Sequence, residues 1–534
     1  MAEMFNNQMI NCAGKRDKSV AESFAQIAVG VYVFAMMIIF PLFYQDKFYN
    51  MGSAKYTFFK YVNLIVLPCV MLLSIVCLIL AMRTMQFKEL VRKISVTDWF
   101  VIGYFLVVVI SYLLSPYRES AWWGSDGWNM GLFSQLVFIG IYFTVSRFFE
   151  VKKTHIYMFC IISGIVFFLG VINRFGIDPL NMHDGQGIAP SFLSTLGQPT
   201  WYSSFLCTVF PIGLYMFWNS DDIKESVAFG IYMFIGFSTM VTQNSDSAYI
   251  AMVLMMLGLF CFSFSSNKKL IRFVEICVIA LTAFKFMGLL QILFADRVFE
   301  LDTLSRMMSQ SSLTLILWLA AIILLAVMLV LNNKGKLNVK RFKKVPSIVC
   351  AILICLFVLF LILIVCVTTG NIPESLNSLR DNSYLNFNDG WGNMRGTNWK
   401  HAIKLIGKSS FLGRLFGCGP DCYEQFLYQN YKAEMDIFWG ANARLSNAHN
   451  EWLNTLVTLG LFGFITYVGI FISKIVTCVK NAAKEPLLVA VVLCILGYMG
   501  HNVFCYQQII CTPTVFIIMG IGEYIIRETK ASDY

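Results

Sequence analysis

Residues 347–369 read SIVCAILICLFVLFLILIVCVTT, a run of 23 positions without a charged side chain. A helix of about 20 apolar residues is long enough to cross the roughly 30 Å hydrocarbon core of a bilayer. A helix on the surface of a soluble protein would also need a polar face, which this run lacks. The segment therefore predicts an integral membrane protein.

Thirteen further apolar runs of spanning length lie on both sides of this segment. They occupy residues 22–43, 61–82, 99–115, 130–146, 156–173, 201–219, 226–243, 248–266, 273–294, 313–332, 461–479, 487–505 and 510–526. The chain is 57% hydrophobic and 13% charged, with a mean hydropathy of +0.67, whereas a soluble domain is about 25% charged. We therefore predict an all-α integral membrane fold with about fourteen transmembrane helices.

The net charge of +10 follows the order of the predicted spans. Of the 41 Lys and Arg residues, 25 lie in the tails and loops on the N-terminal side of the membrane. Because cytoplasmic loops are enriched in Lys and Arg, both termini are expected in the cytoplasm and residues 371–450 outside. The charge is then a topology signal, which favours membrane lipids over nucleic acid as partners.

This topology divides the chain into three parts. Residues 1–370 form transmembrane helices 1–11, residues 371–460 form a large extracytoplasmic loop, and residues 461–534 form helices 12–14 and a cytoplasmic tail. The large loop is expected to fold as a mostly helical cap. Since its polar and aromatic residues far outnumber those of the short basic loops, we expect the protein to act on the outer side.

The large loop ends in Asn447-Ala-His-Asn-Glu-Trp-Leu453. We expect a short amphipathic helix here, with Asn447 as its N-cap and its end at Gly460. His449 would lie in the first turn at the outer membrane face, where the pKa of a neutral imidazole suits a general base. The alternative is an interfacial histidine that only forms hydrogen bonds.

Further motifs surround this block in a fixed order. They are Ser194-Thr-Leu-Gly-Gln-Pro199, Arg395-Gly-Thr-Asn-Trp-Lys-His-Ala402, Phe411-Leu-Gly413, Phe416-Gly-Cys-Gly-Pro-Asp421 and Gly460-Leu-Phe-Gly463. Together they resemble the signature of the O-antigen ligase/polymerase superfamily over roughly residues 193–516. The resemblance implies a GT-C-like fold in a bacterial cytoplasmic (inner) membrane, with the active site on the extracytoplasmic side.

Members of this superfamily transfer a glycan from an undecaprenyl diphosphate carrier to an acceptor hydroxyl. The resemblance implies the same donor here, a glycan or lipid acceptor, and inversion at the anomeric carbon. His449 is the implied base, and the guanidinium of Arg395 would bind the diphosphate in a bidentate manner. Asn450 and Glu451 would contact substrate. A salt bridge within the loop is the alternative role for Arg395.

Neither a metal nor a cofactor is expected, because the five His show no ligand spacing. One position departs from the family pattern. The superfamily usually has an Arg in a T-x-S-R-G block, but residues 242–248 read TQNSDSA and place Asp246 there. Asp246 is then a candidate for binding sugar hydroxyls. Candidates for the missing cation are Arg174, Arg414, Arg444 and Lys60.

Two neutral residues complete the candidate substrate contacts. Gln198 stands in the motif at 194–199, and Trp399 could stack on a sugar ring, although Trp is also common at membrane interfaces. The motifs do not separate a polysaccharide polymerase, slightly favoured by the aromatic residues of the loop, from a ligase or a protein-glycosylating enzyme. A different class, a lipid-linked oligosaccharide flippase, would place its polar residues at the bilayer midplane.

Overall fold

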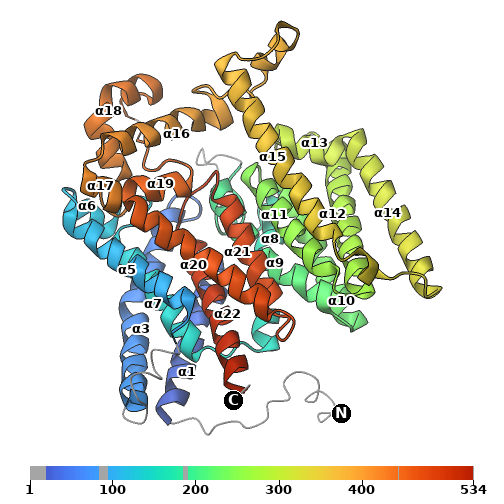
Figure 1. Ribbon diagram of the computed structural model, residues 1–534, viewed down its shortest axis with the longest axis horizontal. Coiled ribbons are helices and arrows are strands. Elements are labelled where there is room, and N and C mark those ends of the chain that lie inside the picture. Colours follow the sequence, from blue (N-terminus) through green and yellow to red (C-terminus); the bar gives the residue numbers. More distant parts are fainter. Residues whose placement is uncertain (1–19, 83–93, 184–190, 443, 533–534) are drawn as a thin grey trace.

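The computed structural model describes residues 20–82, 94–183, 191–442 and 444–532, and the regular structure in these ranges is helical (Figure 1). The helices at the apolar runs are α1 Val20–Phe34 with η1 Ala35–Ile39 and α2 Phe40–Leu42, α3 Met51–Met82, α5 Val96–Leu114, α7 Leu132–Phe148, α8 Lys153–Asn173, α9 Pro199–Asn219, α10 Ile223–Thr242, α11 Ser247–Ser263, α12 Asn267–Leu293, α14 Ser312–Asn333, α15 Val345–Thr369, α20 Gly460–Asn481, α21 Leu488–His501 and α22 Thr512–Ser532.

Nine helical segments of the described residues are long and apolar enough to cross a membrane, and α7, α11 and α21 are apolar but shorter. An all-helical membrane protein is thereby confirmed, while the number fourteen stays a prediction. The basic N-terminal tail and most of the loop at 83–98, which support the predicted topology, lie outside the described residues.

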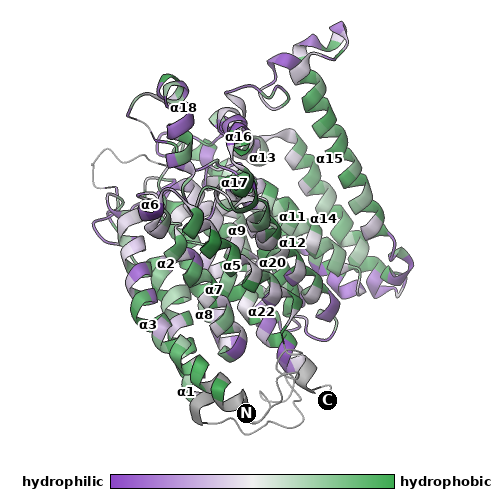
Figure 2. Ribbon diagram, turned by 60° about the vertical axis from the view of Figure 1, so that its left-hand side comes forward, coloured by the Kyte–Doolittle hydropathy of each residue, from purple (hydrophilic) through white to green (hydrophobic). Residues whose placement is uncertain are grey.

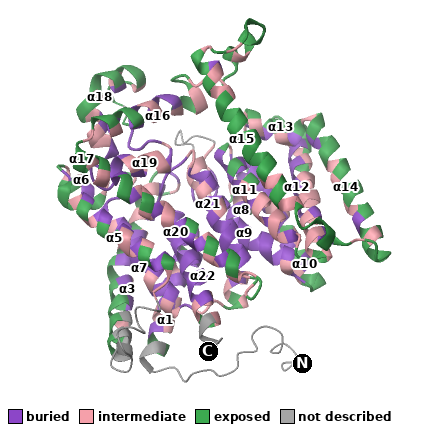
Figure 3. Cartoon of the chain, viewed as in Figure 1, coloured by how far each residue is buried: buried purple, intermediate pink, exposed green. Residues whose placement is uncertain are grey.

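The helices α9 and α21 lie in the interior of the bundle (Figure 3). Every side chain of α9 from 202 to 218 is buried, including Ser203, Ser204 and Thr208. Ser203 Oγ lies 2.8 Å from His501 Nε2 at the end of α21. Because α9 faces protein on all sides, it can carry polar groups that a lipid-facing helix could not.

The opposite case is found in α14 and α15, whose surfaces are apolar almost throughout (Figure 2). Only 11% of the most apolar stretch of α14 is buried in the protein, and none of that of α15. Both helices therefore face lipid. The apolar helix predicted from 347–369 ends as expected, since Gly370 adopts a left-handed conformation (φ 81°) that terminates α15.

Two predicted boundaries are wrong. The helix α3 begins at Met51, so Lys60, expected in an outer loop, is helical, with its Nζ 4.2 Å from the ring centroid of Trp123. The first ten residues of α3 were thus expected outside the helix, and Lys55 among them donates hydrogen bonds to the carbonyl oxygens of Phe40 and Pro41 at the end of the first span. The helix α21 ends at His501, and the segment 502–511 is not helical, although the apolar runs extended into it.

One group of charged side chains inside the bundle forms ion pairs near the ends predicted to be cytoplasmic. Arg147 Nη2 lies 3.1 Å from Asp98 Oδ2, and Arg527 pairs with the same carboxylate. Arg527 Nε is also 3.3 Å from Glu523 Oε1, and Lys474 pairs with Glu523. These pairs join α5, α7, α20 and α22, and they neutralise charges that would be costly in lipid.

Residues between α15 and α20 form a layer of helices over one end of the bundle (Figure 1). The elements are η3 Glu374–Asp381, α16 Trp391–Lys408, α17 Phe411–Phe416, α18 Tyr423–Trp439 and α19 Glu451–Thr458. This layer, the cap, has a small apolar core of its own around Leu405, Tyr423 and Leu427. Ala121 of α6 (Arg118–Trp123) and Val457 of α19 complete that core and attach the cap to the bundle.

Candidate active site

The helix α19 begins later than the sequence predicted. Asn450 is its N-cap, because Asn450 Oδ1 accepts the N–H of Leu453 at 3.0 Å. The side chain of Asn447 instead accepts the N–H of His449 at 2.9 Å and holds the preceding turn. His449 therefore lies just before the helix, not in its first turn. Its φ of 48° is uncommon for a residue with a side chain.

The imidazole of His449 is enclosed by protein. Its ring centroid is 5.2 Å from that of Tyr506, and within the described structure its buried Nδ1 has no hydrogen-bond partner. Burial and the positive charge of Arg395 lower the pKa of His449 to about 4. The ring is therefore neutral at pH 7, the form that can accept a proton.

Arg395 is close enough to His449 to lower its pKa, and backbone carbonyls hold the Arg395 side chain. Residues 392–394 adopt left-handed conformations and produce a kink in α16. Arg395 is the first residue after this kink. Its Nε donates to Phe504 O at 3.1 Å and its Nη1 to Gly392 O at 2.7 Å. No hydrogen bond to the described residues uses Nη2, so this edge of the guanidinium remains available to a phosphate.

The segment 502–511 is the part of the site that the sequence did not predict. Besides Phe504, it contributes Tyr506 beside His449 and Gln507, whose Oε1 accepts from Gln135 Nε2 at 2.8 Å. Gln508 is 3% exposed, and neither polar atom of its side chain has a partner among the described residues. The glutamines that interrupt the apolar pattern were the signal available in the sequence.

Glu451 fastens this segment to α19. Its Oε2 accepts the N–H of Gln507 at 2.7 Å, its Oε1 accepts from Thr455 Oγ1 at 2.9 Å, and its own N–H donates to Asn502 O at 3.0 Å. Burial raises the pKa of the Glu451 carboxyl to about 8. With both oxygens engaged by protein, Glu451 is placed to position its neighbours His449 and Asn450.

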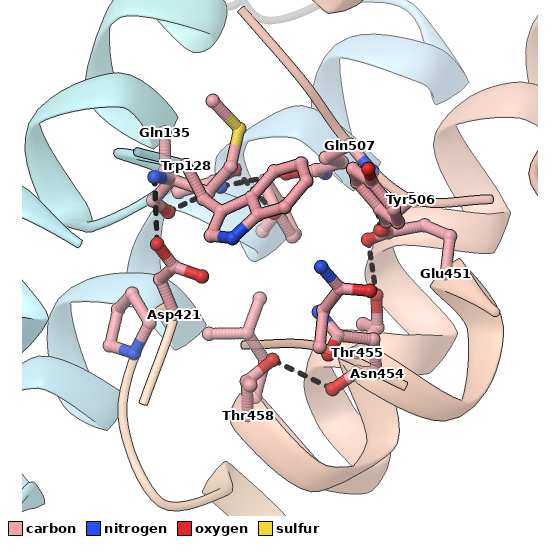
Figure 4. Close-up of a pocket in the computed structure, with 14 residues that line it drawn as sticks. Trp128, Gln135, Asp421, Glu451, Asn454, Thr455, Thr458, Tyr506 and Gln507 are labelled. Atoms are coloured by element: carbon pink, nitrogen blue, oxygen red, sulfur yellow. Dashed lines mark hydrogen bonds between the residues drawn. The ribbon is translucent and has the colours of Figure 1, made fainter. Parts of the chain in front are cut away.

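A small polar cavity lies beneath this junction, and Figure 4 shows Glu451, Asp421, Gln507 and Tyr506 around it. Its enclosed space of about 20 Å³ is enough for one water molecule. Asp421 accepts the N–H groups of Ser125 at 2.8 Å and Met130 at 2.9 Å, and burial raises its pKa to about 7. The cavity is too small for a sugar, so it belongs to the support beneath the site.

Three other predicted contacts lie on different elements. Asp246 precedes α11, and its pKa is raised by burial and by nearby Asp302, while Arg395 opposes that rise. Trp399 lies against Phe504, with ring centroids 5.6 Å apart. Asp246 and Trp399 are thus brought to the surroundings of Arg395. Gln198 is the N-cap of α9, and its Oε1 accepts from the backbone N–H of residue 200 at 3.1 Å.

The four candidate cations are separated by the fold. The side chain of Arg174 is buried, donates to Glu300 O at 3.1 Å, and lies within the electrostatic influence of Asp302, the neighbour of Asp246. The others, which make no described contact with His449 or Arg395, are Lys60 on Trp123, Arg414 bonded to Gly407 O, and Arg444 over Tyr428. Arg174 likewise makes no described contact with His449 or Arg395, and it differs from the other three by the effect of Asp302 on its pKa.

Comparison with known families identifies the domain that holds these residues. Residues 298–468 match the family model described as O-antigen ligase, which covers Arg395 and His449 but not Gln198, Asp246 or 502–511. Residues 298–468 are thus similar to an O-antigen ligase domain, and the match supports the O-antigen ligase/polymerase superfamily that the motifs predicted. A comparison with curated proteins yields no match.

The raised pKa of Glu451 predicts how stability depends on pH. A free glutamate has a pKa of about 4.3, so between that value and about 8 the folded protein holds a proton that the unfolded chain releases. This contribution is complete below about pH 4.3 and is lost as the pH rises through 8. Asp421 acts in the same direction. We expect Glu451→Gln to reduce the fall in Tm between about pH 6 and about pH 9.

Thermal unfolding of the purified protein in detergent measures this effect. Glu374→Gln, an exposed carboxyl in η3, is the matched control and should keep the wild-type pH dependence. A Glu451→Gln protein whose Tm falls as steeply as that of the wild type would contradict the assignment.

Proposed function

We propose that this protein is a metal-independent, inverting glycosyltransferase that moves a glycan from undecaprenyl diphosphate to an acceptor hydroxyl at the outer face of the cytoplasmic membrane. The observation that carries the proposal is the neutral, half-buried imidazole of His449 within the electrostatic influence of the Arg395 guanidinium, both in the segment that matches the O-antigen ligase family model. The proposal includes a GT-C-like arrangement of fourteen spans with both termini in the cytoplasm, supported by the distribution of Lys and Arg.

In the proposed reaction, His449 accepts the proton of the acceptor hydroxyl as the hydroxyl oxygen attacks the anomeric carbon. The new glycosidic C–O bond forms while the bond from the anomeric carbon to the diphosphate breaks. The electron pair leaves with the diphosphate, whose charge Arg395 stabilises. A single displacement inverts the anomeric centre.

The charge of Arg395 couples donor binding to the strength of the base. In the unliganded protein this charge and burial hold the pKa of His449 at about 4, which makes the imidazole a weak base. A bound diphosphate would offset the charge of Arg395 and raise the pKa of His449. The base would then gain strength when the donor is in place, which disfavours wasteful deprotonation without it.

We assign the second donor cation to Arg174. Asp246 stands where the family usually has Arg. The charge of Asp302 affects the pKa of both Asp246 and Arg174, so Arg174 is the candidate cation linked electrostatically to that position. Asp246 is then free to bind sugar hydroxyls. Trp399, whose Nε1 is buried without a described partner, and Gln508 are additional sugar contacts in this proposal. Unpaired buried polar atoms cost about 1–3 kcal/mol each, which a sugar hydroxyl could recover.

A flippase is less well supported. Transport across the bilayer would need polar groups near the midplane. The intramembrane charges at Asp98 and Glu523 are instead paired, and unpartnered polar atoms are found on Trp399 in the cap and on His449 and Gln508 in the segments around the candidate site.

Among transferases, a polymerase remains slightly favoured over a ligase. Aromatic residues of the cap are available to follow a growing glycan, notably Trp391 and Trp399, whose rings lie 5.2 Å apart. Tyr423, another aromatic residue of the large loop, is buried in the core of the cap and is therefore not available to a glycan.

The first test is His449→Ala. Loss of a general base costs about two to four powers of ten in rate, so transfer from a lipid-linked donor in purified membranes should fall by that factor. His155→Ala, at the other end of the bundle, is the control and should retain activity. Near-normal transfer by a stably expressed His449→Ala protein would refute the assigned role.

The second test separates the cations. Arg395→Lys and Arg174→Lys keep the charge but lose the planar fork, and each should weaken donor binding by roughly tenfold or more, because a hydrogen bond to a charged group contributes about 1.5–3 kcal/mol. Arg444→Lys, exposed on the cap, should change binding little. If Arg174→Lys binds donor normally while Arg444→Lys does not, the second cation is Arg444.

The third test distinguishes the transferases by deletion of the gene and sizing of the glycans. A polymerase deletion should leave single repeat units on the carrier at the outer face. Full-length chains retained on undecaprenyl diphosphate would identify a ligase. Repeat units trapped on the cytoplasmic side would instead indicate a flippase.

A further inference from the structure

A second cavity lies far from the candidate active site, between the start of α12 and the connection from α14 to α15. It is a groove of about 760 Å³ lined by Lys268 and Arg272 of α12 and by Lys340 of η2 (Val339–Phe342). These elements lie in the lower right of Figure 1, at the end of the bundle predicted to face the cytoplasm.

The groove is held in shape by one side chain. Asn267 Nδ2 donates to Leu337 O at 2.7 Å, and Asn267 Oδ1 accepts the N–H of Val339 at 3.0 Å. Both atoms of the amide therefore tie the connection to the first turn of α12. Lys340 is thus presented opposite Lys268 and Arg272 by a defined backbone, not by a free loop.

Positive charge exceeds negative charge around the groove. Lys268 pairs with the exposed Asp221, and Arg272 Nη1 lies 2.8 Å from Glu275 Oε2. Lys340 forms no ion pair with the described residues. The connection at 334–344 carries six Lys and Arg and no acidic residue. An anionic ligand would therefore meet uncompensated positive charge from the connection, and on the opposite wall the two cations of α12, each of which already has an acidic partner.

The floor of the groove is apolar. Ile271 and Leu337 line it, and Ile271 packs with Val274 and Met328 in a small buried cluster. Beyond the groove stand α14 and α15, the helices whose apolar surfaces are the least covered by protein. Cations at the mouth and apolar surface beneath and beside it match a ligand with a charged head and hydrocarbon chains.

We propose that this groove binds the phosphate headgroup of an anionic phospholipid from the cytoplasmic leaflet. A soluble phosphate compound would satisfy the cations but would make no use of the apolar floor. The bound lipid would hold the connection against α12 and support α15, which meets α11 at this end, where Cys350 Sγ lies 3.6 Å from Cys261 Sγ. The proposal does not depend on the proposed glycan transfer.

The test measures lipid binding to the full-length protein in detergent by native mass spectrometry and thermal shift. The probes are phosphatidylglycerol, phosphatidylcholine and inorganic pyrophosphate. We expect phosphatidylglycerol to bind saturably and to raise Tm. The triple variant Lys268→Ala/Arg272→Ala/Lys340→Ala should weaken that binding by roughly tenfold or more, since each basic residue near an anionic headgroup contributes about 1 kcal/mol.

The matched control removes the same number of positive charges, all from the connection at 334–344, without changing a residue that lines the groove. It is the exposed triple variant Arg341→Ala/Lys343→Ala/Lys344→Ala, which should retain most of the affinity. Equal losses in the two triple variants would show only diffuse attraction and overturn the proposal. Equal binding of phosphatidylglycerol and phosphatidylcholine, or tighter binding of pyrophosphate, would also overturn it.

A second pair of variants covers the possibility that the groove variant does not fold. Lys340→Glu and Lys344→Glu reverse one exposed charge each, four positions apart in the same connection. Only Lys340→Glu should lower the affinity for phosphatidylglycerol and the associated shift in Tm. The same response from both variants would contradict a specific site.

Discussion

Residues 502–511 connect α21 to α22 without helical geometry while enclosed by protein, so their backbone polar groups need partners there. Glu451 accepts the N–H of Gln507 and donates its own N–H to Asn502 O, and Arg395 donates to Phe504 O. Through these hydrogen bonds, α19 and α16 both contact the segment 502–511. His449 and Arg395 become neighbours because this backbone must be satisfied.

The surroundings of each helix explain its composition. Where protein covers a helix on all sides, as for α9, hydroxyl groups such as Ser203 find partners and the helix need not be uniformly apolar. Where lipid covers it, as for α15, any polar group would lie unsatisfied in hydrocarbon. The hydropathy of a helix therefore depends on whether it faces lipid or protein. For this reason the sequence of α9 is less hydrophobic than that of α15, although α9 lies deeper in the bundle.

The electrostatics of the candidate site follow from the same enclosure. Burial raises the pKa of Glu451 and lowers that of His449, so both are neutral near pH 7 and the positive charge of Arg395 dominates their surroundings. An enclosed positive charge attracts a diphosphate more strongly than an exposed one does. The neutral carboxyl of Glu451 also avoids competing with that ligand for the guanidinium.

The sequence by itself determined the helical membrane class and the similarity of residues 298–468, which include Arg395 and His449, to an O-antigen ligase domain. Both follow from local information: runs such as 347–369 must avoid water, and the motifs lie within short stretches of chain. It also predicted most helices at nearly their observed positions, although local hydropathy could not reveal that α21 stops at His501.

The tertiary structure alone decided how the site is assembled and which candidate residues meet in it. The bond from Arg395 to Phe504 joins positions 109 residues apart, and that from Glu451 to Gln507 joins positions 56 apart. The preference for Arg174 over Arg444 depends equally on distant partners. Such contacts arise from the packing of whole helices, because a residue's partner across the bundle leaves no signal in its neighbouring sequence.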